Sequence, residues 1–263
     1  MKLNKLIKFL FMLSLVIVVI ILSCQNPESS SSGGDSGGSD NDQNEKELAN
    51  GVYAKLIIAR IITEISGTTY KMDSVEAVFS DYYDPCAVIS DLQPTSVSCL
   101  DASGTNYDLI FFNNMYLYND PTDIDGFLKL GLKHEFDVDA SIEVPALTTS
   151  IDLPAVEPTI ITPVNNSIVQ KSNNLDITWN GTTGGSVSVV LISVNNPSEL
   201  ISVETSDNGS YTFNSTQLSS LSSGQYYLHV ERFNEEFIIA SGYDDRSIIR
   251  ARILSSVLIN LTD

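Results

Sequence analysis

The sequence predicts an all-β chain with two β-sandwich domains behind an export signal and a flexible tether. From Leu48 onward, apolar and β-branched residues alternate in short runs, turn clusters separate the runs, and no stretch sustains a 3.6-residue apolar period. Short alternating runs with turn signals between them are typical of sandwiches and barrels, whereas an amphipathic helix requires the helical period. The observations therefore favour strands throughout the exported part.

The first β unit is predicted over residues 48–154. Val52, Ala54, Leu56 and Ile58 alternate with their neighbours, and similar runs follow at residues 75–79, 95–100, 109–117 and 130–138. Clusters of Ser, Gly, Asp and Thr lie between the runs at residues 66–68 and 101–104, and these residue types favour turns. The pattern predicts several short strands joined by tight turns.

A proline-rich segment marks the predicted boundary between the two units. It contains Pro145, Pro154, Pro158 and Pro163, and proline cannot supply the ladder hydrogen bonds of a central strand. Each unit then has about 105 residues, a usual size for one domain. We place the boundary at residues 154/155, so that the second unit covers residues 155–263 and closes with an alternating run at 253–261.

The chain begins with a segment that has the layout of a secretory signal. Lys2, Lys5 and Lys8 precede an apolar run over residues 9–22, which is shorter than the roughly 20 residues that a spanning helix needs. Residues 21–24, Ile-Leu-Ser-Cys, resemble the lipobox of bacterial lipoproteins, which implies cleavage after residue 23 and lipidation of Cys24. Cleavage by an ordinary signal peptidase, with an incidental cysteine, is the alternative.

The composition of the mature chain agrees with an exported protein, and its charge argues against binding to nucleic acid. Removing the three signal lysines leaves 11 basic against 33 acidic residues, a formal charge near −22, which repels phosphate backbones. Residues 24–47 are rich in Ser, Gly and Asp and contain almost no apolar residue, so they predict a disordered tether with a reach of roughly 25 Å. Several acyl chains on Cys24 would hold this tether on a membrane.

Two cysteines remain once Cys24 carries lipid. Cys86 and Cys99 form an even pair in an exported protein, which predicts a disulfide. The bridge would close a loop of about 14 residues and contribute roughly 3 kcal/mol in the chain-entropy model. Two reduced and separately buried thiols are the alternative.

The second unit resembles an immunoglobulin-like sandwich. Residues 174–179, Asn-Leu-Asp-Ile-Thr-Trp, and the run at 186–191 look like the second and third strands of a fibronectin type III domain, and residues 221–230 look like its tyrosine corner and following strand. Residues 160–163, 177–179 and 209–213 more narrowly resemble Ser/Thr-rich surface-anchored modules of the yeast cell-wall Kre9/Knh kind. The resemblance covers about residues 158–234 and implies fold rather than function. It also implies that Trp179 and Tyr226 pack in a core, with sugar stacking as the alternative for Trp179.

Candidate catalytic groups are scarce, so the sequence predicts no enzyme and no cofactor. Residues 34–38, Gly-Asp-Ser-Gly-Gly, match the nucleophile motif of trypsin-like proteases, but they lie in the tether and lack the rigid scaffold and histidine base that the chemistry needs. His134 and His229 lie in alternating runs, where we expect surface or edge residues. No Cys/His cluster has the spacing of a zinc site.

One segment has oxygen ligands at close spacing. Asp120, Asp123 and Asp125 precede Gly126, and carboxylates with a glycine turn are used by calcium loops. Pro121 and Leu132 occupy positions where the helix-flanked calcium loop requires ligands, so a solvated turn is the stronger interpretation. The three aspartates remain a weak calcium candidate.

The sequence thus predicts a surface or envelope lipoprotein. Its β-sandwich modules would bind an extracellular protein or glycan, or serve a structural role, on the outer membrane or cell surface. The alternative is a glycan-active or accessory enzyme whose first unit carries an unrecognised pair of carboxylates.

Overall fold

The computed structural model describes residues 47–263 except 66, 84–89, 121–125 and 183. The predicted signal peptide, Cys24, the tether up to residue 46 with the protease-like motif at 34–38, Cys86, Asp123 and Asp125 lie outside the described residues. The regular secondary structure of the described chain is strand except for the short helix α2, which confirms the predicted all-β class. Its elements are β1 (Glu47–Ile65), β2 (Thr68–Tyr83), β3 (Ser96–Asp101), β4 (Asn106–Asp108), β5 (Ile110–Phe112), β6 (Met115–Tyr118), β7 (Lys133–Asp139), β8 (Leu147–Asp152), β9 (Ile160–Thr162), β10 (Ser167–Gln170), β11 (Leu175–Trp179), β12 (Ser186–Ser193), β13 (Leu200–Ser206), β14 (Ser210–Phe213), α2 (Ser215–Ser219), β15 (Gly224–Phe237) and β16 (Ile248–Thr262).

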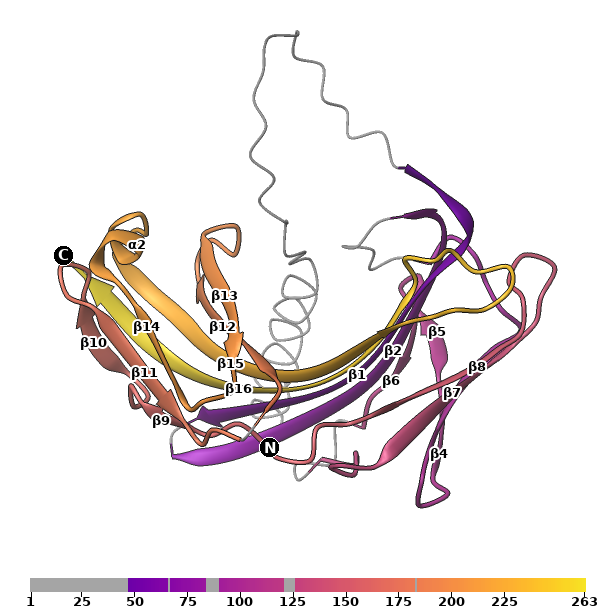
Figure 1. The fold of residues 1–263 in the computed structure, drawn as a ribbon, viewed down its shortest axis with the longest axis horizontal. Helices are drawn as coiled ribbons and strands as arrows, with labels where there is room; N and C mark the ends of the chain where they lie inside the picture. Colours follow the sequence, from indigo (N-terminus) through magenta and orange to yellow (C-terminus); the bar gives the residue numbers. More distant parts are fainter. Residues whose placement is uncertain (1–46, 66, 84–89, 121–125, 183) are drawn as a thin grey trace, which may run out of the picture.

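One large curved sheet runs through the whole described chain (Figure 1). Nine described strands belong to it, in the order β13-β12-β15-β16-β1-β2-β6-β5, and β10 pairs with β16 beside this path. β1 and β16 run parallel in one unbroken register from Lys55↔Ile248 to Thr63↔Ser256. Strands from the two ends of the chain therefore lie next to each other at the centre of the sheet.

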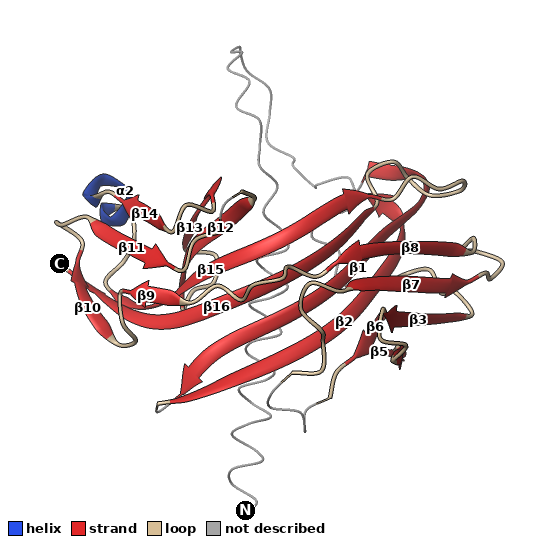
Figure 2. Cartoon of the chain, turned by 60° about the horizontal axis from the view of Figure 1, so that its bottom comes forward, coloured by secondary structure: helices blue, strands red, loops and turns tan. Residues whose placement is uncertain are grey.

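Two smaller sheets pack on this large one, at opposite ends (Figure 2). One has the order β4-β3-β7-β8 and the other β14-β11-β9. In β16, Ile249, Ala251 and Ile253 belong to the first core, while Ile259 and Leu261 belong to the second. All five have odd numbers, and alternate residues of a strand point to the same side. Both small sheets therefore cover the same face of the large sheet.

The predicted boundary at residue 155 falls in the linker between the two small sheets. The large sheet is nevertheless common to both units, because β15 and β16, with 14 and 15 residues, are long enough to extend along both. Residues from the last part of the chain, among them Ile238, Tyr243 and Ile253, complete the first core. The two units thus have separate cores on a shared sheet.

Two buried arginines hold the linker against the large sheet. Arg60 forms an ion pair with Asp73 at 2.8 Å and reaches Glu157 of the linker at 2.9 Å. Arg232 donates to the carbonyl oxygen of Val156 at 3.2 Å. Since Arg60 and Arg232 come from β1 and β15, which lie on either side of β16, these contacts hold the linker at two nearby points of the large sheet.

Candidate binding site

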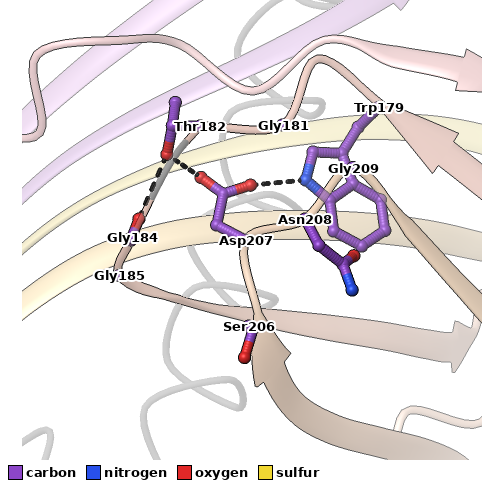
Figure 3. A pocket seen from close by; sticks show the side chains of 9 residues that line it. All are labelled: Trp179, Gly181, Thr182, Gly184, Gly185, Ser206, Asp207, Asn208 and Gly209. Carbon is purple, nitrogen blue, oxygen red and sulfur yellow. Dashed lines mark hydrogen bonds between the residues drawn. The ribbon is translucent and has the colours of Figure 1, made fainter.

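An open pocket of about 810 Å³ lies at one end of the second sandwich. β11 ends there at Trp179, and the turn between β13 and β14 faces the loop that follows β11 (Figure 3). The residues that line it are Trp179, Gly181, Thr182, Gly184, Gly185, Ser206, Asp207, Asn208 and Gly209. Backbone hydrogen bonds join the two segments, from Trp179 to Gly209 at 2.9 Å and from Thr182 to Asp207 at 3.1 Å.

Glycines allow this close approach of two backbones. Gly209 has a φ of +92°, a conformation that other residues rarely adopt. A Cβ at Gly181 would lie 2.6 Å from the backbone nitrogen of Gly209, which no real side chain tolerates. The pocket wall is therefore built from main chain, and backbone donors and acceptors line it.

Asp207 is the polar centre of the site. Its carboxylate accepts hydrogen bonds from Trp179 Nε1 at 2.7 Å and from Thr182 Oγ1 at 2.5 Å (Figure 3). Arg232 completes the set, with Nε at 2.6 Å and Nη2 at 3.2 Å. Asp207 and Arg232 are both buried, and an ionised carboxylate that accepts several hydrogen bonds in this way is strongly fixed.

The network keeps Asp207 ionised. Burial alone would raise the pKa of this carboxyl, but the hydrogen bonds from Arg232, Thr182 and Trp179 outweigh burial, so the pKa is lowered. A carboxylate with a lowered pKa is a poor general base and no general acid at neutral pH. Asp207 therefore stays ionised at neutral pH and, through its hydrogen bonds, holds the two segments of the pocket wall together.

The two aromatic residues predicted to pack in the core are buried. Trp179 is 3% exposed and Tyr226 1% exposed, and both belong to the second core. The hydroxyl of Tyr226 donates to the carbonyl oxygen of Ser222 at 3.0 Å, four residues upstream, as a tyrosine corner does. Trp179 reaches the pocket only from beneath it, because its ring lies in the core and its Nε1–H is bound by Asp207.

The prediction that His134 and His229 are surface or edge residues is wrong. Both are buried, at 0% and 3% exposure. Burial lowers the pKa of both imidazoles, that of His229 to about 3 with Arg252 contributing, so both are neutral at pH 7. His134 shares its side of β7 with the core residues Phe136 and Val138, so the alternation of this strand itself placed the imidazole on the covered side.

The cysteine and calcium predictions remain predictions. Cys99 is buried in the core of the first unit and forms no disulfide with another described residue, and burial, with Asp101 adding to it, raises the pKa of its thiol to about 12. Its predicted partner Cys86 and two of the three candidate aspartates lie outside the described residues, as does Cys24. Among the residues that the structure describes, no group of three or more acidic, histidine or cysteine side chains could hold a metal ion.

Sequence reasoning missed the Asp207–Arg232 pair. One signal for it was present, because Arg232 continues the inward alternation of Tyr226, Leu228 and Val230 in β15. A charged residue at an inward position requires a partner. The position of that partner, 25 residues away in a turn, has no local signature.

The described helices include none with the length and apolar character needed to cross a bilayer. No protein-family model matches the chain, and no curated protein matches its sequence.

Several solved structures resemble it weakly. A tetra-tandem repeat from the extending region of a large adhesion protein is 14% identical over 78% of this chain, with a TM-score of 0.21, and the chain spans 50% of that structure. The N-terminal Ig1-2 module of the Drosophila receptor protein tyrosine phosphatase DLAR is 9% identical over 81% of this chain and 100% of its own, with a TM-score of 0.29. The BSP domain of a biofilm associated protein is 16% identical over 81% of this chain and 30% of its own, with a TM-score of 0.22. Neighbours at this level of similarity do not define a function for the chain.

Proposed function

We propose that the chain is a non-enzymatic envelope lipoprotein that displays a rigid pair of β-sandwiches on a lipid anchor at Cys24 and binds an extracellular glycan or protein. The lipid would be attached after removal of residues 1–23, and the tether would carry the sandwiches off the outer membrane or cell surface. The resemblance of the second unit to surface-anchored modules of the Kre9/Knh kind agrees with this role.

The continuous sheet is the observation that carries the proposal. Both cores rest on one face of it, and Arg60 and Arg232 fix the linker between them. A binding module gains from such rigidity, because less conformational entropy is lost when a ligand docks. The pocket carboxylate Asp207 is committed to its three partners, so the site holds a shape and does not supply an acid or base.

The pocket suits a neutral ligand rich in hydroxyl groups. Its open wall presents backbone groups of Gly184 and Gly185 and the exposed side chains of Ser206 and Asn208. With a formal net charge of −19, the whole chain disfavours anions. A neutral sugar matches these donors and acceptors without the cost of burying a charge.

The anchor is tested by the variant Cys24→Ala in cells fed a tagged fatty acid. We expect the label and the membrane association to disappear, while Ser36→Ala, a matched change within the predicted tether, keeps both. Label retained on Cys24→Ala would contradict the proposal.

The pocket is tested by filling it. Ser206→Trp places a large side chain at the pocket wall, and Ser202→Trp places the same side chain at an exposed position four residues earlier in β13, outside the lining residues. We expect Ser206→Trp alone to lose retention on immobilised neutral hexose oligosaccharides. Equal retention of the two variants would show that the pocket is not the binding site.

A further inference from the structure

Two isoleucines protrude from neighbouring loops at one end of the molecule. Ile142 is 105% exposed and Ile239 is 96% exposed, the highest values among the exposed large apolar side chains that the structure describes. Ile142 lies between β7 and β8, and Ile239 lies between β15 and β16. The hydroxyl of Tyr243 donates to the carbonyl oxygen of Pro145 at 2.7 Å, which joins the two loops.

Hydrogen bonds fix both loops. The hydroxyl oxygen of Ser141 accepts from the backbone nitrogens of Glu143 and Val144 at 3.2 and 3.1 Å, while the side chain of Val144 is fully buried in the first core. In the other loop, the carboxylate of Asp244 accepts from Arg246 Nε at 2.8 Å. The isoleucines are therefore held outward and cannot bury themselves by a local collapse of the loop.

The described chain begins beside these loops. The backbone nitrogen of Asn50 donates to Asp244 at 2.6 Å, and that of Val52 donates to the carbonyl oxygen of Gly242 at 2.9 Å. Figure 1 shows the start of β1 and the two loops at the same end of the large sheet. The segment that would connect the sandwiches to a lipid on Cys24 thus joins them at the end that carries Ile142 and Ile239.

We propose that this end of the molecule lies on the membrane and inserts Ile142 and Ile239 among the lipids. The inference rests on the proposed lipid anchor. The exposed acidic residues Glu143 and Asp245 lie in the same two loops as the isoleucines, whereas Asp244 is buried and paired with Arg246. The two exposed carboxylates would disfavour an anionic lipid surface, so the contact is apolar and directed to zwitterionic lipid. This contact would be a second point of attachment beside the lipid anchor, and the two points together would set the orientation of the protein on the membrane.

Two isoleucines bind lipid weakly by themselves, and the anchor supplies the missing affinity. A tether of the length between Cys24 and Glu47 has a reach of roughly 25 Å, which keeps the loops at high local concentration near the surface. Stable attachment to membranes commonly combines two weak signals of this kind. The loops would therefore set the orientation of the protein, while the lipid keeps it on the membrane.

Tryptophan probes test the contact directly. Ile142→Trp, Ile239→Trp and Ile168→Trp are prepared in the full lipidated protein and reconstituted in phosphatidylcholine vesicles with brominated acyl chains. Ile168 is the matched control, because it is 75% exposed on β10 at the far end of the large sheet. The only native tryptophan, Trp179, is buried and gives a constant background. We expect bromine to quench the probes at 142 and 239, with a blue shift of their emission, and to leave the probe at 168 unchanged.

The outcomes separate this inference from the proposed function. A protein that floats with the vesicles, but whose probes at 142 and 239 are quenched no more than the probe at 168, overturns the inference and leaves the anchor intact. A blue shift that appears without vesicles and grows with protein concentration assigns the isoleucines to a second copy of the chain, and this also overturns it. A protein that does not float with vesicles overturns the anchor and the inference together.

Discussion

Removing the carboxylate of Asp207 should strongly destabilise the second sandwich. In Asp207→Ala, the buried guanidinium of Arg232 loses its counter-ion, and Trp179 Nε1 and the hydroxyl of Thr182 lose their acceptor. Breaking a buried ion pair by removing one partner costs about 3–5 kcal/mol, because an uncompensated charge stays buried. We expect the free energy of unfolding to fall by that amount.

The assay is urea unfolding of the mature chain followed by the emission of Trp179. Thr182→Val is the matched control, which removes one hydrogen bond from the same carboxylate and should cost about 1 kcal/mol. The double variant Asp207→Leu with Arg232→Met removes both charges and should recover most of the loss, since apolar replacements of a buried pair are often neutral. If Asp207→Ala costs no more than Thr182→Val, the network does not stabilise the fold and the reasoning fails.

The pH dependence of the same pair has a defined sign. The pKa of Asp207 is lower in the folded protein than in the unfolded chain. Its contribution is therefore complete above the unfolded pKa, near 3.9, and is lost as the pH falls through the lower folded pKa. The difference in unfolding free energy between the parent protein and Asp207→Ala should shrink over that window.

Three further predictions concern other parts of the fold. Trp179→Ala should cost about 3–5 kcal/mol in the same urea assay, the range for deleting a large buried aromatic, and an unchanged midpoint would contradict the core assignment. Asp101 is buried, but hydrogen bonds from Ser103, Thr105 and Tyr107 outweigh burial and lower its pKa to about 2. Asp101→Asn should therefore remove roughly 2 kcal/mol of stability at neutral pH. This difference in stability should vanish as the pH falls from 4 towards 2. Cys86 and Cys99 should resist alkylation in denaturant until they are reduced, as intact mass would show; thiols that alkylate without reduction would support the alternative of two free cysteines.

The strand content was predictable from alternation, whereas the pairing of strands was not. The alternation from Val52 to Ile58 and the run at 253–261 mark strands that the structure contains. Their parallel pairing places Lys55 beside Ile248, although the two residues lie at opposite ends of the described sequence. Periodicity reports which side chains share a face, but it carries no information about which distant strand lies alongside.

Alternation within a strand also explains which predictions about the site succeeded and which failed. Trp179 and Tyr226 could be assigned to a core because every second neighbour in their strands is apolar. His229 belongs to the opposite face of β15, which is also buried around it, so a polar residue between apolar ones does not mark a surface there. The turn that contains Asp207 is recognisable from its Asn-Gly step, but its contact with Arg232 depends on how two strands are placed in space.

The parallel pairing of β1 with β16 also determines the order in which the molecule can fold. Residues 55–63 pair with β2 on one side, but on the other side they pair with residues 248–256, and closing so long a loop costs entropy before any contact is gained. The first core contains Ile249, Ala251 and Ile253, so it cannot be completed before β16 is in place. The hairpin of β1 and β2 can form early, but the other edge of β1 stays unpaired until β16 is in place and needs protection from aggregation in the meantime.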